Sequence, residues 1–127
     1  MIKPIMKSEF FLRLPSEDAG PDDAATGQDL LDTLHEHEHE CVGLAANMIG
    51  VRKRIICVKD GNRALLMYNP QILEQVNSYQ TSEGCLSLSG ERPCTRYRRI
   101  KVEYLDENFV HRIKNFSGYT AEIIQHE

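Results

Sequence analysis

Two short stretches of the chain carry side chains suited to metal chemistry. The first is Glu83-Gly84-Cys85-Leu86-Ser87, where Gly84 allows the tight turn that would present the Cys85 sulfur. The second is Gln125-His126-Glu127, which opens the helical pattern H-E-x-x-H, whose two His bind one metal while the Glu acts as base. Because thiolate and imidazole are strong ligands for zinc and iron, we expect Cys85 and His126 to meet at one divalent ion.

Each stretch is a weak signal alone, and the ligand set is unfinished. A lone Cys is more often inert packing, and an adjacent His and Glu are common by chance. The second His of the pattern would fall three residues after Glu127. Since the last helix lacks a Gly, Asn or Pro stop signal, we expect residues 1–127 to be a single, C-terminally incomplete domain, with a degenerate homologue as the alternative.

Residues 35–40 alternate His and Glu and invite a second metal interpretation. His35 and His39 would share one face of a helix. The other interpretation is a solvated helix end with cations near the C-terminal dipole, and we favour it because the pattern specifies no third ligand.

The length and net charge of the chain argue against some classes of protein. The chain has 127 residues, enough for one domain with its own core, and a net charge of −4 that argues against a broad nucleic-acid or membrane surface. No apolar run approaches the roughly 18 residues that span a bilayer, and residues 1–7 do not form a signal peptide. We therefore expect a cytoplasmic protein without a nucleic-acid motif or membrane segment, and no feature assigns an oligomeric state.

Periodicity predicts an α+β protein in which short strands lie between two helices. Residues 1–25 contain Pro and Gly breaks and read as irregular, and Leu30, Leu31 and Leu34 predict a helix from residue 28 to about 40. Turn signals stand at Asp60-Gly61, Asn69-Pro70 and residues 106–108. We expect strands at residues 54–59, 64–68, 72–76, 79–82, 100–105 and 109–116, and a helix from residue 119.

The small residues of the segment 41–50 would let a second backbone approach closely, although a helix–strand junction also explains them. This segment, E-G-C-L-S and Q-H-E follow one another in an order that resembles the peptide deformylase family across nearly the whole chain. E-G-C-L-S is the most specific of the three, and the 41 positions from Cys85 to His126 fit as well. The resemblance implies short antiparallel strands around a C-terminal motif helix, plus an N-terminal helix.

The resemblance also implies a reaction. A member of this family removes the formyl group from the N-terminal methionine of nascent peptides, which would be this chain's partners, at the ribosome. Cys85 and His126 would be metal ligands, with Fe2+ expected first and Zn2+, Ni2+ or Co2+ as alternatives. Glu127 would serve as general acid and base, and the Leu86 N–H would stabilise the oxyanion.

The implied peptide site lies along the small-residue segment, where the substrate would add as a strand. Arg92 matches a family arginine near the site, with a solvated surface charge as its alternative, and Glu83 with Arg96 forms a hypothetical ion pair that orients the Cys85 turn. The expected substrate-binding residues are Val42, Gly43, Leu44, Ala45, Met48, Gly84 and Arg92.

Two positions depart from the family pattern. Met48 stands where the family carries a Gln that donates to the formyl oxygen, and a thioether cannot donate. Cys41 stands at the first Gly of the motif. Met48 is either packing or, together with the absent second His of H-E-x-x-H, a sign of a catalytically impaired, deformylase-like peptide-binding protein, which is the alternative function. A zincin-like protease fits less well, because Cys85 has no role in one.

Overall fold

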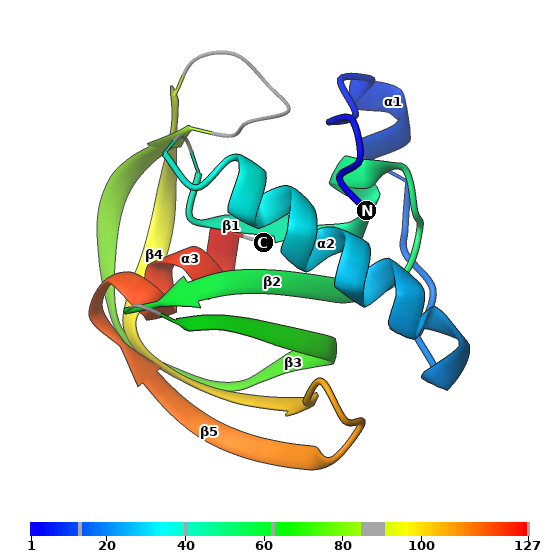
Figure 1. Ribbon diagram of the computed structural model, residues 1–127. Helices are drawn as coiled ribbons and strands as arrows, with labels where there is room; N and C mark the ends of the chain where they lie inside the picture. Colours follow the sequence, from blue (N-terminus) through cyan, green and yellow to red (C-terminus); the bar gives the residue numbers. More distant parts are fainter. Residues whose placement is uncertain (13, 40, 62, 85–90, 127) are drawn as a thin grey trace.

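One antiparallel sheet with helices on both faces makes up the computed structural model, which describes residues 1–12, 14–39, 41–61, 63–84 and 91–126 (Figure 1). The sheet runs in the order β1-β2-β3-β4-β5, and each strand is antiparallel to the next. The architecture confirms the α+β prediction. The elements are α1 (Glu9–Leu12), η1 (Pro21–Asp23), α2 (Ala24–Glu36), β1 (Gly43–Ala45), η2 (Ala46–Ile49), β2 (Ile55–Asp60), β3 (Arg63–Gly84), β4 (Glu91–Leu105), β5 (His111–Ser117) and α3 (Gly118–His126).

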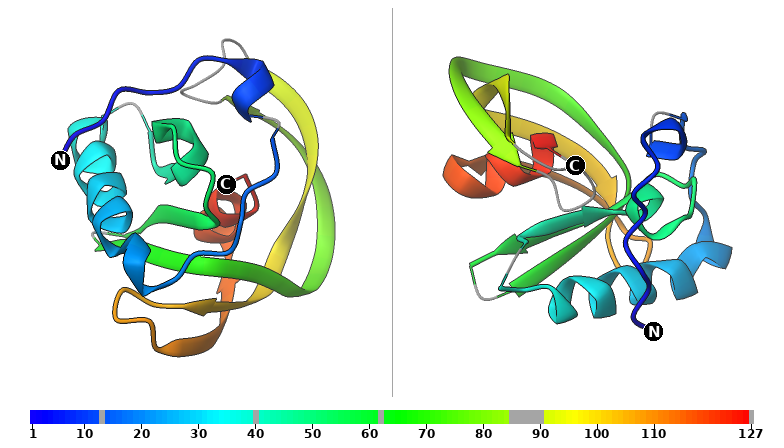
Figure 2. Two further views of the ribbon diagram at one scale, coloured as in Figure 1. Left: turned by 90° about the vertical axis from the view of Figure 1, so that its right-hand side faces the viewer. Right: turned by 90° about the horizontal axis from the view of Figure 1, so that it is seen from above.

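Strand β2 separates two hydrophobic cores, because its residues Ile55, Ile56, Cys57 and Val58 are all buried. Side chains alternate along a strand, so Ile55 and Cys57 join the core under α2, while Ile56 and Val58 join the core under α3. The right-hand view of Figure 2 shows α2 and α3 on opposite sides of this strand. The first core contains Leu30, Leu34, Leu44, Met48, Leu66 and Tyr68, and the second contains Met67, Ile100, Val102, Phe116, Ala121 and Ile124.

Strands β3 and β4 form a long hairpin that arches over α3 (Figure 2). The prediction of separate strands ending at Asn69-Pro70 was wrong, because β3 runs unbroken from Arg63 to Gly84. Asn69 adopts a left-handed φ of 53°, and its side chain bonds the N–H and C=O of Ala19 at 2.6 and 2.9 Å. These bonds hold a register shift that carries the strand past the proline.

Several other boundaries differ from the prediction. Helix α2 spans Ala24–Glu36 rather than 28 to 40, since Leu34 is its last buried apolar side chain. His39 thus lies beyond the helix, and the His35 and His39 side chains are 82% and 93% exposed beside Glu38, which favours the solvated interpretation.

Strand β4 begins nine residues before the predicted strand, because pairing with β3 keeps this segment extended although its apolar residues do not alternate. Helix α1 lies within the predicted irregular segment, and β5 begins two residues late, after a turn with Phe109 at φ 60°.

Gly27 of α2 allows the helix to contact the sheet directly. A Cβ at this position would overlap the hydroxyl of buried Tyr68 and lie 2.9 Å from Leu66 Cδ2. We therefore expect Gly27→Ala to lower the free energy of unfolding by about 1–3 kcal/mol, although alanine is the better helix former. Urea unfolding measures the change, with Gly20→Ala as control, because a Cβ there has no neighbour within 4 Å. Equal stability of the two variants would contradict the close approach.

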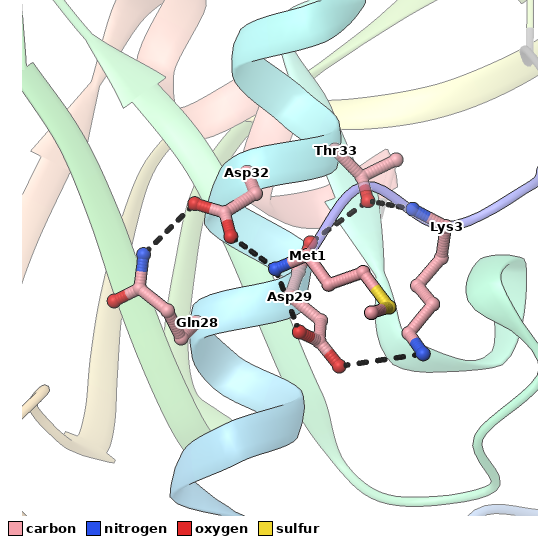
Figure 3. A network of polar contacts seen from close by, with 6 residues as sticks. All are labelled: Met1, Lys3, Gln28, Asp29, Asp32 and Thr33. Carbon is pink, nitrogen blue, oxygen red and sulfur yellow. Dashed lines mark hydrogen bonds and ion pairs between the residues drawn. The ribbon is translucent and has the colours of Figure 1, made fainter.

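The N-terminal residue is fastened to α2 by a polar network (Figure 3). The Met1 ammonium donates to Asp29 at 2.9 Å and also to Asp32, whose other oxygen accepts from Gln28. The Lys3 backbone N–H donates to the Thr33 hydroxyl at 2.9 Å. The first three residues are therefore bound to the surface of α2.

This network makes a pH-dependent contribution to stability. Its hydrogen bond to Asp32 raises the pKa of the Met1 amine above the ordinary 8.0, and the same bond lowers the pKa of Asp32 below 3.8. The contribution is therefore present between about pH 4 and 8, and it is lost as pH rises through the amine pKa or falls through that of Asp32. We expect the gap in melting temperature between the wild type and Asp32→Asn to be widest in this window. A gap independent of pH, or one equal to that of Asp22→Asn, would contradict this.

Candidate active site

Strand β1 offers a sheet edge beside the predicted motif. It pairs with β2 through Gly43↔Val58 and Ala45↔Ile56, and among the described residues no strand pairs with its other side. The Val42 carbonyl accepts from Lys59 at 2.8 Å, so alternation points the N–H and C=O of Gly43 and Ala45 away from β2. The backbone of β1 can thus take an added strand, whereas the Leu44 side chain, fully buried in the first core, cannot contact a ligand.

Sulfur atoms contact two of these outward groups. The Cys41 thiol donates to the Gly43 carbonyl at 3.2 Å, and the Ala45 N–H donates to the Met48 thioether at 3.4 Å. Met48 is only 5% exposed and packs in the first core, which favours the packing interpretation of this position. The two positions that depart from the family pattern are therefore the two that place sulfur on the β1 edge.

The end of β3 is held by an ion pair. Arg96 of β4 bonds both carboxylate oxygens of Glu83, with Nη2 to Oε1 at 2.7 Å and Nε to Oε2 at 2.9 Å. The predicted pair is therefore present, and this hydrogen bonding raises the pKa of Arg96. Because Glu83 stands two residues before Cys85, the pair fixes the strand end that leads to this cysteine, and its effect on the metal stays a hypothesis.

Helix α3 reaches the same strand end through Glu122. Burial raises the pKa of Glu122 above its ordinary value, and a hydrogen bond with Glu83 raises it further. Glu122 precedes His126 by four residues, so the two positions share one face of α3. The face that carries position 126 is therefore turned toward the end of β3 from which position 85 follows.

The metal-binding prediction falls mainly outside the described residues. Cys85, Leu86 and Glu127 lie outside them, and only the backbones of Arg92 in β4 and His126 in α3 are described. Within the described part of the chain, no three His, Cys, Asp or Glu side chains are grouped to hold a metal ion. What the structure does bring together is the two segments that lead to Cys85 and His126.

Glu122 and Gln125 belong to the neighbourhood of the site, and the sequence analysis gave neither a role. Gln125 bonds the backbone of Tyr97 in β4 with both ends of its amide. The helical spacing from Glu122 to His126 was a signal that could have been used. Nothing in the sequence indicated that Gln125 would meet Tyr97.

Comparison with known proteins decides the family. The polypeptide deformylase family model matches residues 6–127. The chain belongs to the polypeptide deformylase family. The peptide deformylase of Clostridium beijerinckii is 51% identical over 127 residues, which cover all of this chain and 93% of the relative.

Solved deformylases share the fold as well. The peptide deformylase of Thermus thermophilus matches with a TM-score of 0.89 and 32% identity, covering all of this chain and 79% of that one. A Met-Ala-Ser-bound class I type b peptide deformylase of Acinetobacter baumannii matches with a TM-score of 0.87 and 29% identity, covering all of this chain and 92% of that one.

As a deformylase, this protein is a metal-dependent hydrolase that removes the N-formyl group from the N-terminal methionine of nascent peptides. No finding specifically favours the impaired peptide-binding alternative. None of the described helices combines the length and apolar character needed to cross a membrane.

Proposed function

We propose that residues 1–127 form a single deformylase domain in which Cys85 and His126 hold Fe2+, with Zn2+, Ni2+ and Co2+ as substitutes. The observation that carries this proposal is that neighbouring residues of β4 bind both segments that lead to these two residues: Arg96 pairs with Glu83 at the end of β3, and the Tyr97 backbone bonds Gln125 of α3. A thiolate and an imidazole are a donor set that fits iron and zinc. A metal held there supplies Lewis acidity and lowers the pKa of water toward neutrality.

The remaining chemistry is assigned to groups of the chain. Glu127 accepts the proton of the attacking water and later gives it to the leaving amine. The Leu86 N–H donates to the formyl oxygen as that oxygen gains negative charge. The water oxygen bonds the formyl carbon and the C–N bond breaks, which yields formate and a free N-terminal amine.

The peptide lies along β1 as an added strand. Its backbone replaces the weak sulfur contacts of Gly43 and Ala45 with amide hydrogen bonds, while Val42 and Leu44 hold this edge by pairing with β2 and Gly84 stands at the end of β3. Arg92 and Met48 complete the site. The Met-Ala-Ser bound to the Acinetobacter baumannii enzyme supports a site for peptides that begin with methionine. The substrates are formylated chains that emerge from the ribosome in the cytoplasm.

Formate release from formyl-Met-Ala-Ser tests the proposal. The protein is prepared with the second His of H-E-x-x-H present and loaded anaerobically with Fe2+ or Ni2+. We expect turnover that a chelator abolishes and added metal restores, and no turnover after Cys85→Ala. Absence of turnover from the metal-loaded protein would refute the proposed function.

A further inference from the structure

We propose that Gln125 is a positioning residue for the metal site, because its amide fixes the rotation of α3 and hence the side of the helix on which position 126 lies. This inference rests on the proposed function. The Gln125 Oε1 accepts from the Tyr97 N–H at 2.8 Å, and its Nε2 donates to the Tyr97 carbonyl at 2.8 Å and to the Ala121 carbonyl at 3.0 Å. All hydrogen-bonding capacity of the amide except one acceptor lone pair is engaged.

The location of these bonds explains why an amide stands there. Pairing of β5 with β4 ends at Arg99↔Ser117. Tyr97 lies two residues before Arg99 in β4, just beyond this last pair. Backbone groups two residues apart on a strand point the same way, so Tyr97 presents an N–H and a C=O where β5 no longer covers them. A primary amide offers the same donor and acceptor as a peptide group, so Gln125 takes the place of the next β5 residue.

A second contact fixes the same helix. Glu122, one turn before position 126, faces Glu83 at the end of β3, and burial together with this carboxylate raises the pKa of Glu122. The Gln125 bonds to Tyr97 therefore oppose rotation of α3 about its axis. This matters for a metal ligand, because a rotation of about 20° moves an atom about 6 Å from the axis by about 2 Å. Ligand distances tolerate only about 0.2 Å.

A purely structural role would produce different results from a positioning role. If Gln125 only docks α3, removing its hydrogen bonds lowers the melting temperature and leaves the metal site of the folded protein intact. If it positions His126, the site itself weakens at temperatures where every variant is folded. Residues that orient metal ligands typically change metal affinity by about 10- to 100-fold when replaced.

The experiment compares Gln125→Met, which keeps the length and loses every hydrogen bond, with Gln125→Glu, which can still accept from Tyr97. Gln80→Met is the matched control, since Gln80 donates to Thr95 at 2.8 Å on the β3–β4 hairpin away from α3. The Kd for Co2+ is measured by chelator competition on protein that carries the second His, and the Co2+ absorption spectrum reports the ligand geometry.

We expect the Co2+ Kd to rise about 10- to 100-fold in Gln125→Met and less in Gln125→Glu, with shifted absorption bands. The kcat for formyl-Met-Ala-Ser should fall with little change in KM, and Gln80→Met should match the wild type. The inference would be overturned if both folded Gln125 variants kept the wild-type Co2+ Kd and spectrum. If Gln125→Met does not fold, the same result in Gln125→Glu alone would overturn it. In either case the proposed function would stand. A wild type that binds no Co2+ and releases no formate would overturn both.

Discussion

Replacing Met48 by Gln is expected to raise kcat/KM for formyl-Met-Ala-Ser about 10²- to 10³-fold, because one added oxyanion donor contributes about 2.7–4 kcal/mol in the transition state. The two side chains have similar length and shape. In the empty enzyme, the Gln oxygen can take over the contact that the Met48 sulfur makes with the Ala45 N–H, at 3.4 Å in this structure, and the bound peptide then displaces it. With the peptide bound, the prediction requires the Gln NH₂ group to reach the formyl oxygen.

The same substitution should weaken the fold. Met48 is buried in the first core, and an amide NH₂ group without a partner in the empty enzyme costs about 1–3 kcal/mol. Urea unfolding measures this loss, and formate release measures the gain in rate. Met48→Leu is the control, because it keeps the apolar volume and adds no donor, so its activity should equal the wild type. A folded, metal-loaded Met48→Gln with unchanged kcat/KM would show that the formyl oxygen is out of reach of position 48.

Replacing Glu127 by Gln should lower kcat about 10²- to 10⁴-fold, the usual range for loss of a general acid–base group. The amide has nearly the same shape as the carboxylate and cannot take the proton of the attacking water. Substrate binding and metal affinity do not use that proton, so KM and the metal Kd should change little. The comparison needs steady-state formate release together with chelator competition on each variant.

Glu107→Gln is the matched control for this experiment. Glu107 is an exposed carboxylate in the turn between β4 and β5, so its loss changes the net charge by the same amount. We expect its kcat to equal that of the wild type. If Glu127→Gln also kept the wild-type kcat, Glu127 would have no part in the proton transfers, and another base would have to be sought among the neighbours of α3.

The elements that depend on local sequence were predictable. Alternation of apolar residues predicted strands near β2 and at the end of β4, and Asp60-Gly61 predicted the turn between β2 and β3. The long β3 was not predictable, because at Asn69-Pro70 it is held by bonds to Ala19, fifty residues earlier in the chain, and to Arg54. Local preference favoured a break there, and a tertiary contact overrode it.

The same distinction applies to the site. Residue type and order indicated the ion pair of Glu83 with Arg96, which the structure contains. They also indicated Cys85 and His126 as metal ligands, and that assignment stays a prediction. The links from α3 to the sheet were not visible, since Glu122 and Glu83 are far apart along the chain and Gln125 meets a backbone group of Tyr97 rather than a complementary side chain. Backbone partners depend on strand register, and only the folded sheet fixes that register.

The fastening of Met1 makes the charge of its nitrogen part of the contact with α2. A formyl group on the Met1 nitrogen would turn the ammonium into a neutral amide, which cannot pair as a cation with Asp29 and Asp32. The segment that follows donates from the Met6 N–H to the Met48 carbonyl at 2.7 Å, so it lies directly against the motif that carries the substrate edge. Acylation of this nitrogen would therefore hold the segment less firmly and loosen a contact beside the substrate edge.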